Sequence, residues 1–560
     1  MRKSTGTQSR LELAIPPALH SNTMPCHQGQ TARTRTGQPD GPGVGPPLWT
    51  ENRIKEARVE RGLADYLICY SGKVIPSECN FAGRLVERLG ENSDLIDAAT
   101  GQTFPATDVP GLIVGFGAGF LSIGLRPGDC VLISCGLNSA STLAYLGAMY
   151  AGCVPLLVDE HTLAASGNLV FAKAHAKAAW TAKRVPWDWA KKNGFPQIEG
   201  NFDPCPVHLL RPAPCAENDL AVLMPTSGST GVPRLVTVSH GNLIANTEAI
   251  IRSQHLGTDE KAMLIMPVSY CFGASIMHTH LYQGGGVVFD SRFMFPDKVL
   301  QAVNTYGCTT FAGVPTVYNI LLRRSHLGSI VLPGLRRFLQ AGGVLAPESV
   351  QEMRNIVPTA NFFVMYGQTE ATARISCLPP DRLGEKLGSA GVPLDNVTTR
   401  IVDDKGQELP NGQTGEIQVR GPSVCGGYLD EPEATERKFD HGWLKTGDLG
   451  SRDEEGYLWI KGRTGEFIKI CGIRVSFAEV EAKVAAIPGV YECAAAGVHH
   501  PEAGEALALF IVGENGDHGL VQRVRHALPP QWTCTSVKVV AELPRTANGK
   551  IARSQLQTLL

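Results

Sequence analysis

Short apolar runs alternate with helical stretches over most of this chain, and this alternation constrains the fold more than any other feature. From residue 112 to 158, one helical stretch precedes the apolar run 128–134 and a second precedes 154–158. This order is typical of a βαβ unit in a parallel sheet. The same alternation predicts strands at 261–266, 286–290, 309–314, 337–340 and 362–365. We therefore predict a large layered α/β region.

The predicted secondary structure changes toward the C-terminus. From about residue 397, short strands are separated by turn-forming segments that end at Gly406, Gly412 and Gly456, which predicts a β-rich cap on the large region. After Arg463 a smaller α+β unit follows, with a strand at 466–470, a helix at 477–487, strands near 494–498 and 506–512, and a helix near 519–528. A chain of 560 residues exceeds the roughly 250–300 at which single cores stop growing.

The composition favours a small-molecule partner. Because 51 Lys and Arg stand against 53 Asp and Glu, no large field of one sign would attract nucleic acid or a membrane surface. The 15 cysteines form no C-x-x-C pair and no zinc-type cluster, so we expect reduced thiols in the cytoplasm. The most apolar stretch, 110–125, is shorter than the roughly 20 residues of a membrane span and contains five glycines.

The N-terminal 46 residues mix Arg, Thr, Gln, Gly and Pro with little apolar periodicity. We interpret them as a disordered leader or an upstream-start artefact, with an organelle transit peptide as the alternative. The expected divisions are thus a leader at 1–46, a large domain at 47–463 and a small domain at 464–560.

A loop rich in hydroxyls and glycines directly follows the apolar run 220–224. In such a loop, glycines let backbone N–H groups approach an anion, and hydroxyls and a cation add charge-assisted donors. A flexible Ser/Gly turn is the alternative for this motif alone. The triphosphate-loop hypothesis comprises Thr226, Ser227, Gly228, Ser229, Thr230, Gly231 and Arg234.

Three further motifs follow in order. Tyr366-Gly367-Gln368-Thr369-Glu370 comes immediately after a predicted strand, where ligands of α/β sheets gather. Next come Thr446-Gly447-Asp448 and Gly462-Arg463, and finally Gly549-Lys550 near the C-terminus. Alone, each has an ordinary alternative: a capped helix start, an Asp capping a turn, or a solvated lysine.

Together and in this order, the four motifs resemble those of the acyl-adenylate-forming superfamily of acyl-CoA synthetases, adenylation domains and beetle luciferases. The resemblance spans about residues 50–560. It implies an α/β fold whose large N-terminal domain has two layered α/β subdomains and a β-barrel-like subdomain. It also implies a small, mobile α+β C-terminal domain, with the active site in the cleft between the two domains.

The resemblance also implies a role for each matched position. The phosphate loop would contact the ATP β- and γ-phosphates, Thr369 the α-phosphate and Glu370 the Mg²⁺. Lys550 would bridge the substrate carboxylate and the nucleotide and stabilise charge in the transition state, with Gly465 as the hinge of the C-terminal domain. Adenine would be held by Tyr366 with Gly342 and Gly343, and the ribose by Asp448 and Arg463.

Four positions depart from the family pattern. Arg234 replaces the usual lysine of the phosphate loop, which keeps the charge but changes its geometry, and Leu235 stands where glycine is common. Gly465 replaces the usual Asp or Lys of the hinge, where glycine tolerates a changing backbone. Tyr270 replaces a gating histidine at the mouth of the acid pocket.

The substrate class follows from the same gate region. Amino-acid-activating relatives place an Asp there to pair with the substrate ammonium, and no acidic residue is present between Tyr270 and Phe272. We therefore expect an aryl or short-to-medium acyl acid. The expected lining comprises Tyr270, Phe272, Gly313, Gly343 and Ala371.

The expected acceptor is a thiol, either CoA or the phosphopantetheine arm of a carrier protein. Transfer to an amine, a non-catalytic acyl-nucleotide binder and a luciferase-like oxygenase are the alternatives. Retention of both Glu370 and Lys550 argues against a non-catalytic binder.

Overall fold

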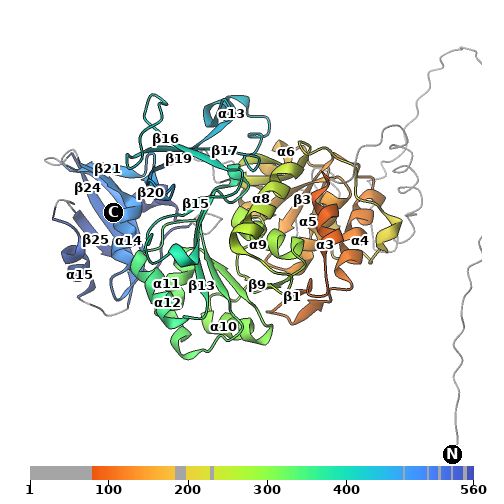
Figure 1. Ribbon diagram of the computed structural model, residues 1–560, viewed down its shortest axis with the longest axis horizontal. Coiled ribbons are helices and arrows are strands. Elements are labelled where there is room, and N and C mark those ends of the chain that lie inside the picture. Colours follow the sequence, from red (N-terminus) through yellow and green to blue (C-terminus); the bar gives the residue numbers. More distant parts are fainter. Residues whose placement is uncertain are drawn as a thin grey trace, which may run out of the picture. The chain divides into compact units, whose positions relative to one another are not determined.

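The computed structural model of the protein describes residues 79–182, 197–226, 233–470, 473–500, 504–514, 517, 519–530, 532, 534–545 and 551–560. Within these residues the strands form four sheets, and helices cover the larger ones (Figure 1). The predicted leader at 1–46 lies outside the described residues. The predicted domain boundary after Arg463 stays a prediction.

A six-stranded sheet has the order β6-β5-β3-β4-β7-β8, and only its β7–β8 pair is antiparallel. Its central strand is buried throughout because helices pack on both faces: Val131 and Ile133 share a core with α4 and α5, and Leu132 shares one with α6. The elements are α4 (Val109–Ser122), β3 (Cys130–Cys135), α5 (Ser139–Tyr150), β4 (Val154–Asp159), α6 (Glu160–Lys173), β5 (Ala178–Thr181), β6 (Gln197–Glu199), β7 (Leu220–Thr226) and β8 (Arg234–Ser239).

A nine-stranded sheet has the order β15-β14-β13-β12-β11-β9-β10-β1-β2, and it contains the five strands predicted between 261 and 366. From β1 to β13 these neighbours run parallel, so the carboxyl ends of β11, β12 and β13 meet at one edge. The strands are β1 (Leu95–Asp97), β2 (Gln102–Phe104), β9 (Lys261–Leu264), β10 (Gly286–Phe289), β11 (Thr310–Gly313), β12 (Arg337–Gln340), β13 (Asn361–Tyr366), β14 (Ser376–Leu378) and β15 (Val392–Pro393).

Four of the remaining helices begin at recognisable local signals. Ser239 and Asn242 form a reciprocal capping box at the start of α8, and a proline occupies the first turn of α10, α11 and α12. The helices are α3 (Phe81–Arg88), α8 (His240–Gln254), α9 (Cys271–Tyr282), α10 (Pro296–Thr305), α11 (Pro315–Arg324) and α12 (Pro347–Ile356).

The β-rich region predicted after residue 397 is an antiparallel sheet. Strands β16, β17, β19 and β18 are neighbours in that order, and β20 pairs with β19. Gly406, Gly412 and Gly456 have positive φ angles of 79°, 82° and 88°, which confirms the predicted turns. The elements are β16 (Thr398–Val402), β17 (Gly415–Arg420), α13 (Pro432–Lys438), β18 (Phe439–Asp440), β19 (Trp443–Arg452) and β20 (Leu458–Arg463).

The C-terminal elements form a fourth sheet with its own apolar core, in which Ile468, Val480 and Leu509 are buried together. This arrangement confirms the α+β organisation predicted for this part of the chain. The elements are β21 (Phe467–Ile470), β22 (Ile473–Ser476), α14 (Phe477–Ala485), β23 (Val490–His500), β24 (Gly504–Gly513), α15 (Leu520–Ala527), β25 (Cys534–Val539) and α16 (Arg553–Leu556).

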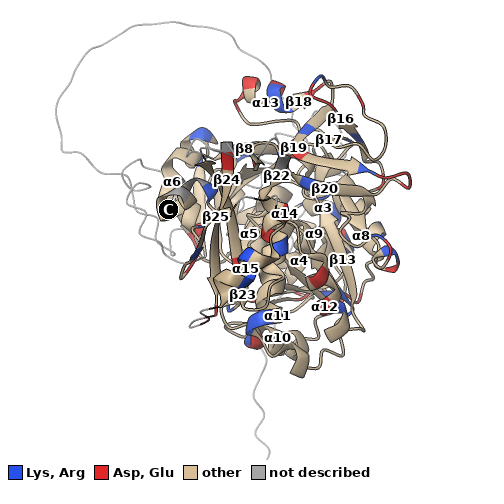
Figure 2. Ribbon diagram, turned by 90° about the vertical axis from the view of Figure 1, so that its left-hand side faces the viewer, with Lys and Arg blue, Asp and Glu red and all other residues tan. Residues whose placement is uncertain are grey.

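Two surface properties match the composition. In Figure 2 the basic and acidic segments are interspersed over the visible elements, as expected for nearly balanced charges. Among the described residues, no helix is long and apolar enough to cross a membrane. The most apolar stretch forms helix α4, which is 14 residues long and packs into the core.

Candidate active site

The predicted phosphate loop connects the two antiparallel strands β7 and β8. Thr226, the last residue of β7, is paired with Arg234, the first residue of β8. The intervening positions lie outside the described residues, so their phosphate contacts stay predictions; these positions are Ser227, Gly228, Ser229, Thr230 and Gly231. The hairpin fixes both ends of this loop.

The cation of this loop is already paired within the protein. The Nε atom of Arg234 lies 3.2 Å from a carboxylate oxygen of Glu431, and Lys173 Nζ lies 2.6 Å from the other oxygen. The Arg234 guanidinium also lies 5.4 Å from the ring centroid of Tyr428. The paired Lys173 lowers the pKa of Glu431, so the carboxylate stays ionised between the two cations.

The second motif leaves β13 at the edge where the parallel strands end. A Cβ atom on Gly367 would lie 1.8 Å from the carbonyl oxygen of Ala373, so only glycine permits this close approach of two backbone segments. Beside it, the Tyr366 hydroxyl donates a 2.6 Å hydrogen bond to Oδ2 of Asp448. Gln368 donates a longer bond of 3.4 Å to the Thr446 carbonyl, so the second and third motifs are joined.

Asp448 is the centre of this junction. It lies opposite Arg463 in the β19–β20 pair, and Arg463 Nε lies 2.9 Å from Asp448 Oδ1. The Asp448 carboxylate raises the pKa of Arg463, and burial followed by the Asp448 charge raises that of Tyr366. A carboxylate held between a hydroxyl and a guanidinium is a suitable acceptor for paired sugar hydroxyls.

Glu370 is the carboxylate expected to hold the metal, and it is 9% exposed. The Tyr428 hydroxyl donates a 2.6 Å hydrogen bond to Glu370 Oε1, which fixes the carboxylate in place. The described residues contain no cluster of three or more potential metal ligands. A single carboxylate fits Mg²⁺, which typically takes one or two protein carboxylates and completes its shell with water and phosphate oxygens.

Lys438 is a charged residue of this site that the motifs did not indicate. Lys438 is the last residue of α13, and its Nζ donates a 2.9 Å hydrogen bond to the Thr446 carbonyl. Burial lowers its pKa, and the Glu370 carboxylate acts in the opposite direction. In sequence, a lysine at the end of a polar helix is typical of a solvated surface, so no local signal marks its partial burial.

Two residues of the predicted acid pocket, Tyr270 and Phe272, lie at the start of α9. The rings of Tyr270 and Phe272 meet edge-on with centroids 6.3 Å apart. A Cβ atom on Gly342 would lie 2.6 Å from the Tyr270 hydroxyl oxygen, so the gate residue lies against the predicted adenine segment. Thr369 also reaches α9, with Oγ1 3.4 Å from Cys271 Sγ.

The other three predicted lining residues contact different parts of the protein. Gly313 ends β11 and lies against Val317, and Gly343 lies against Pro315. Ala371 is fully buried in a separate cluster, the core of the antiparallel sheet. The lining roles of all three stay predictions.

The structure describes the predicted hinge residue but not the predicted catalytic lysine. Gly465 has a positive φ of 88° between β20 and β21, and a Cβ atom there would meet no heavy atom within 4 Å. Lys550 lies outside the described residues, whereas Arg545 and Ile551 on either side of that segment form an antiparallel bridge. Their proposed roles stay predictions.

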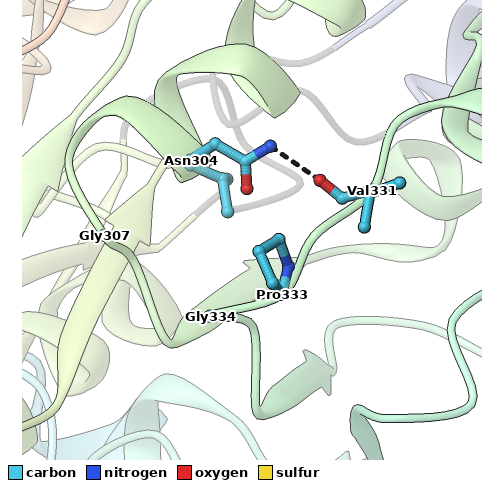
Figure 3. A pocket seen from close by; sticks show the side chains of 6 residues that line it. Asn304, Gly307, Val331, Pro333 and Gly334 are labelled. Atoms are coloured by element: carbon cyan, nitrogen blue, oxygen red, sulfur yellow. Dashed lines mark hydrogen bonds between the residues drawn. The ribbon is translucent and has the colours of Figure 1, made fainter.

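A separate pocket of about 520 Å³ lies at the amino ends of β11 and β12, the edge opposite the motifs (Figure 3). Its wall includes Asn304, whose side-chain amide donates a 2.7 Å hydrogen bond to the Val331 carbonyl. None of its lining residues is titratable, so it carries no chemistry comparable to the motif edge.

Comparison with known proteins agrees with the geometry. The AMP-binding enzyme family matches residues 107–429, and the AMP-binding enzyme C-terminal domain matches residues 479–550. A feruloyl-CoA synthase from Amycolatopsis sp is 32% identical over 461 residues, covering 78% of this chain and 90% of that protein.

Solved structures match over similar lengths. ATP-bound MatB from Rhodopseudomonas palustris has a TM-score of 0.75 at 26% identity, covering 86% of this chain and 98% of that one. The amide bond synthetase McbA from Marinactinospora thermotolerans also has a TM-score of 0.75 at 26% identity, covering 87% and 100%. This chain belongs to the AMP-binding enzyme family of adenylate-forming enzymes.

Proposed function

We propose that the protein is an AMP-forming acid–thiol ligase that activates a carboxylic acid with ATP and passes the acyl group to CoA. The observation that supports this most directly is the Tyr366–Asp448 hydrogen bond, which joins two motifs 82 positions apart. Arg463 completes the same cluster from the neighbouring strand. Such a cluster would hold the nucleotide in a fixed position at the edge where the parallel strands end.

The two half-reactions follow from this placement. In the first, an oxygen of the substrate carboxylate attacks the α-phosphorus, and the bond to pyrophosphate breaks. Asp448, Arg463 and Tyr366 orient that phosphorus by binding the ribose and the base. Glu370 would hold Mg²⁺, which neutralises phosphate charge when bound. In the second, the thiol sulfur attacks the acyl carbon and AMP leaves.

CoA is the acceptor that the relatives favour, because the matched Amycolatopsis protein is named as a CoA synthase. The similarity to an amide bond synthetase keeps transfer to an amine as the second candidate. A carrier-protein thiol presents the same chemistry as CoA, and the cytoplasmic location also stays a prediction. A non-catalytic binder would not need Glu370 and Lys550, and both are retained.

The first half-reaction is tested by acid-dependent pyrophosphate release with ATP, Mg²⁺ and a panel of aryl, acyl and amino acids. Hydroxylamine traps the adenylate, and mass spectrometry then compares CoA with amines as acceptors. We expect Glu370→Gln to lower the adenylation rate by about 10²-fold, because a fixed charge near the phosphates is lost.

The matched control is Glu348→Gln on the exposed surface of α12, which should leave the rate unchanged. If no acid in the panel releases pyrophosphate, the proposed activity is wrong. If pyrophosphate is released but amides form in place of thioesters, the activation step stands and the acceptor is the amine.

A further inference from the structure

Arg374 is a buried cation beside the predicted acid pocket. It follows Thr372 and Ala373, whose positive φ angles of 53° and 93° are uncommon for residues other than glycine. The side chain is only 1% exposed and is among the largest fully buried ones. A guanidinium in such a position is destabilising unless a partner compensates its charge.

The backbone of Arg374 is fixed by a second buried residue. Asn246 of α8, which is 2% exposed, donates from Nδ2 to the Arg374 carbonyl at 2.8 Å. The Arg374 N–H group in turn lies 3.3 Å from Asn246 Oδ1. These two hydrogen bonds fix the backbone position from which the arginine side chain extends. The burial of the side chain therefore follows from the fold.

Among the described residues, no carboxylate pairs with this guanidinium or is among the groups that act on its charge. Its central carbon lies 5.2 Å from the ring centroid of Phe272, and Nη1 contacts the sulfur of Met365. Burial lowers the pKa of Arg374 to about 10, so the group remains cationic near pH 7. The groups that act on its charge are the thiols of Cys377 and Cys271 and the hydroxyl of Tyr270.

Nε and Nη2 form one edge of the buried guanidinium. Among the described residues, Nε and Nη2 of Arg374 have no hydrogen-bond partner, although both are buried. The same pair of nitrogens on Arg292 binds both oxygens of Asp290, at 2.9 and 2.7 Å. This edge therefore has the geometry that binds a planar two-oxygen anion.

We propose that Arg374 binds a second carboxylate, at the end of the substrate remote from the carboxylate that is adenylated. The substrate class is then a dicarboxylic acid, and this inference rests on the proposed function. Phe272 links the two regions, because it contacts both Arg374 and the gate residue Tyr270. A cationic substrate would be repelled at this position, which agrees with the absence of an acidic residue in the gate.

The test compares acids that differ only in the second carboxylate: pentanedioate with pentanoate, and benzene-1,4-dicarboxylate with benzoate. For wild-type protein we expect the kcat/KM of adenylation to be at least about 10-fold higher for the better diacid than for its monoacid. Arg374→Leu should lower the diacid value by about 100-fold and leave the monoacid value within a few-fold. Arg374→Lys keeps the positive charge but loses the paired N–H groups that bind both oxygens of a carboxylate. Its kcat/KM for the diacid should therefore be intermediate.

Arg354→Leu on α12, where the guanidinium contacts only Gln351 in the described residues, is the matched control and should change neither value. A wild-type preference for monoacids would overturn the inference while leaving the ligase activity intact, and so would an equal loss for both acids in Arg374→Leu. Absence of adenylation with every acid would instead refute the proposed function.

The acyl-sulfamoyl adenosine analogues of each pair provide a second measurement that needs neither turnover nor the variant. Tighter binding of the analogue with the free carboxylate to wild-type protein supports the inference, and equal binding refutes it.

Discussion

The proposed nucleotide side and the proposed acid side of this site differ in how their charged groups are paired. On the nucleotide side, Asp448 accepts from Tyr366 and pairs with Arg463, and Glu370 accepts from Tyr428. On the proposed acid side, the buried Nε and Nη2 of Arg374 have no hydrogen-bond partner in the described residues. The groups proposed for adenylation are thus fixed by partners within the protein. On the proposed acid side, a ligand would have to provide the partner of Arg374.

The largest expected effect is on the nucleotide side, for Lys550→Ala. If Lys550 stabilises charge developing between the carboxylate and the α-phosphate, the variant should adenylate about 10²–10³-fold more slowly. Transfer from a chemically prepared acyl-adenylate to CoA should stay within a few-fold of wild type. Single-turnover rates of the two half-reactions measure both.

Lys461→Ala, which removes an exposed lysine of β20, is the control for the loss of a positive charge. An equal decrease of both half-reactions in Lys550→Ala would mean that the lysine supports the fold and not the adenylation step.

The next effect in size concerns Asp448→Asn. The amide keeps the shape of the side chain but removes the charge that pairs with Arg463 at 2.9 Å. Hydrogen bonds to charged groups contribute about 1.5–3 kcal/mol, so kcat/KM for ATP should fall roughly 10- to 100-fold. The KM of the acid should hardly change. A comparable change in both values would show that the two sides are not separate.

Three buried histidines give a smaller, pH-dependent prediction. His278 and His280 of α9, with His240 of α8, are buried, and burial lowers their pKa values to about 3, 4 and 4. The unfolded chain takes up protons below about pH 6.5, whereas the folded protein resists until pH 3–4, so stability is lost as the pH falls through this window. As the pH falls from 7 to 5, each of these histidines should lower the free energy of unfolding by about 2 kcal/mol.

Urea unfolding at several pH values measures this loss, and His278→Gln should reduce it by the share of one histidine. The glutamine can still bond to the Tyr145 hydroxyl, which lies 3.0 Å from His278 Nε2. A stability that is independent of pH between 7 and 5 would mean that water reaches these side chains and that burial does not lower their pKa values.

The parts of the molecule that local patterns determine were predictable. The strand at 337–340 was predicted with its observed bounds, because the regular strand-then-helix alternation marks its place between Arg-rich and Pro-initiated helical stretches. The motifs likewise grouped Tyr366, Asp448 and Arg463. The buried cations were not predictable. Arg374 is held by Asn246, 128 positions away, and such packing leaves no trace in the neighbouring sequence.

The smallest expected effect is that of Glu431→Gln, and its sign is the informative part. Glu431 holds Arg234 at 3.2 Å, at the beginning of β8 directly after the phosphate loop. If Arg234 must leave this pair to bind phosphate, removing the carboxylate should lower the KM for ATP by up to about five-fold, because partly exposed pairs contribute at most about 1 kcal/mol. If Glu431 instead positions Arg234, the KM should rise.

Arg234→Lys separates these two cases, since lysine keeps the charge but loses the planar fork that meets the Glu431 carboxylate. When Arg234 exchanges between Glu431 and ATP, Glu431→Gln should have a weaker effect in the lysine background. Equal effects in both backgrounds would assign the change to Lys173, the other cation of Glu431 at 2.6 Å. Arg234 would then stay paired within the protein, whereas Nε and Nη2 of Arg374, which have no partner in the described residues, would still require a ligand.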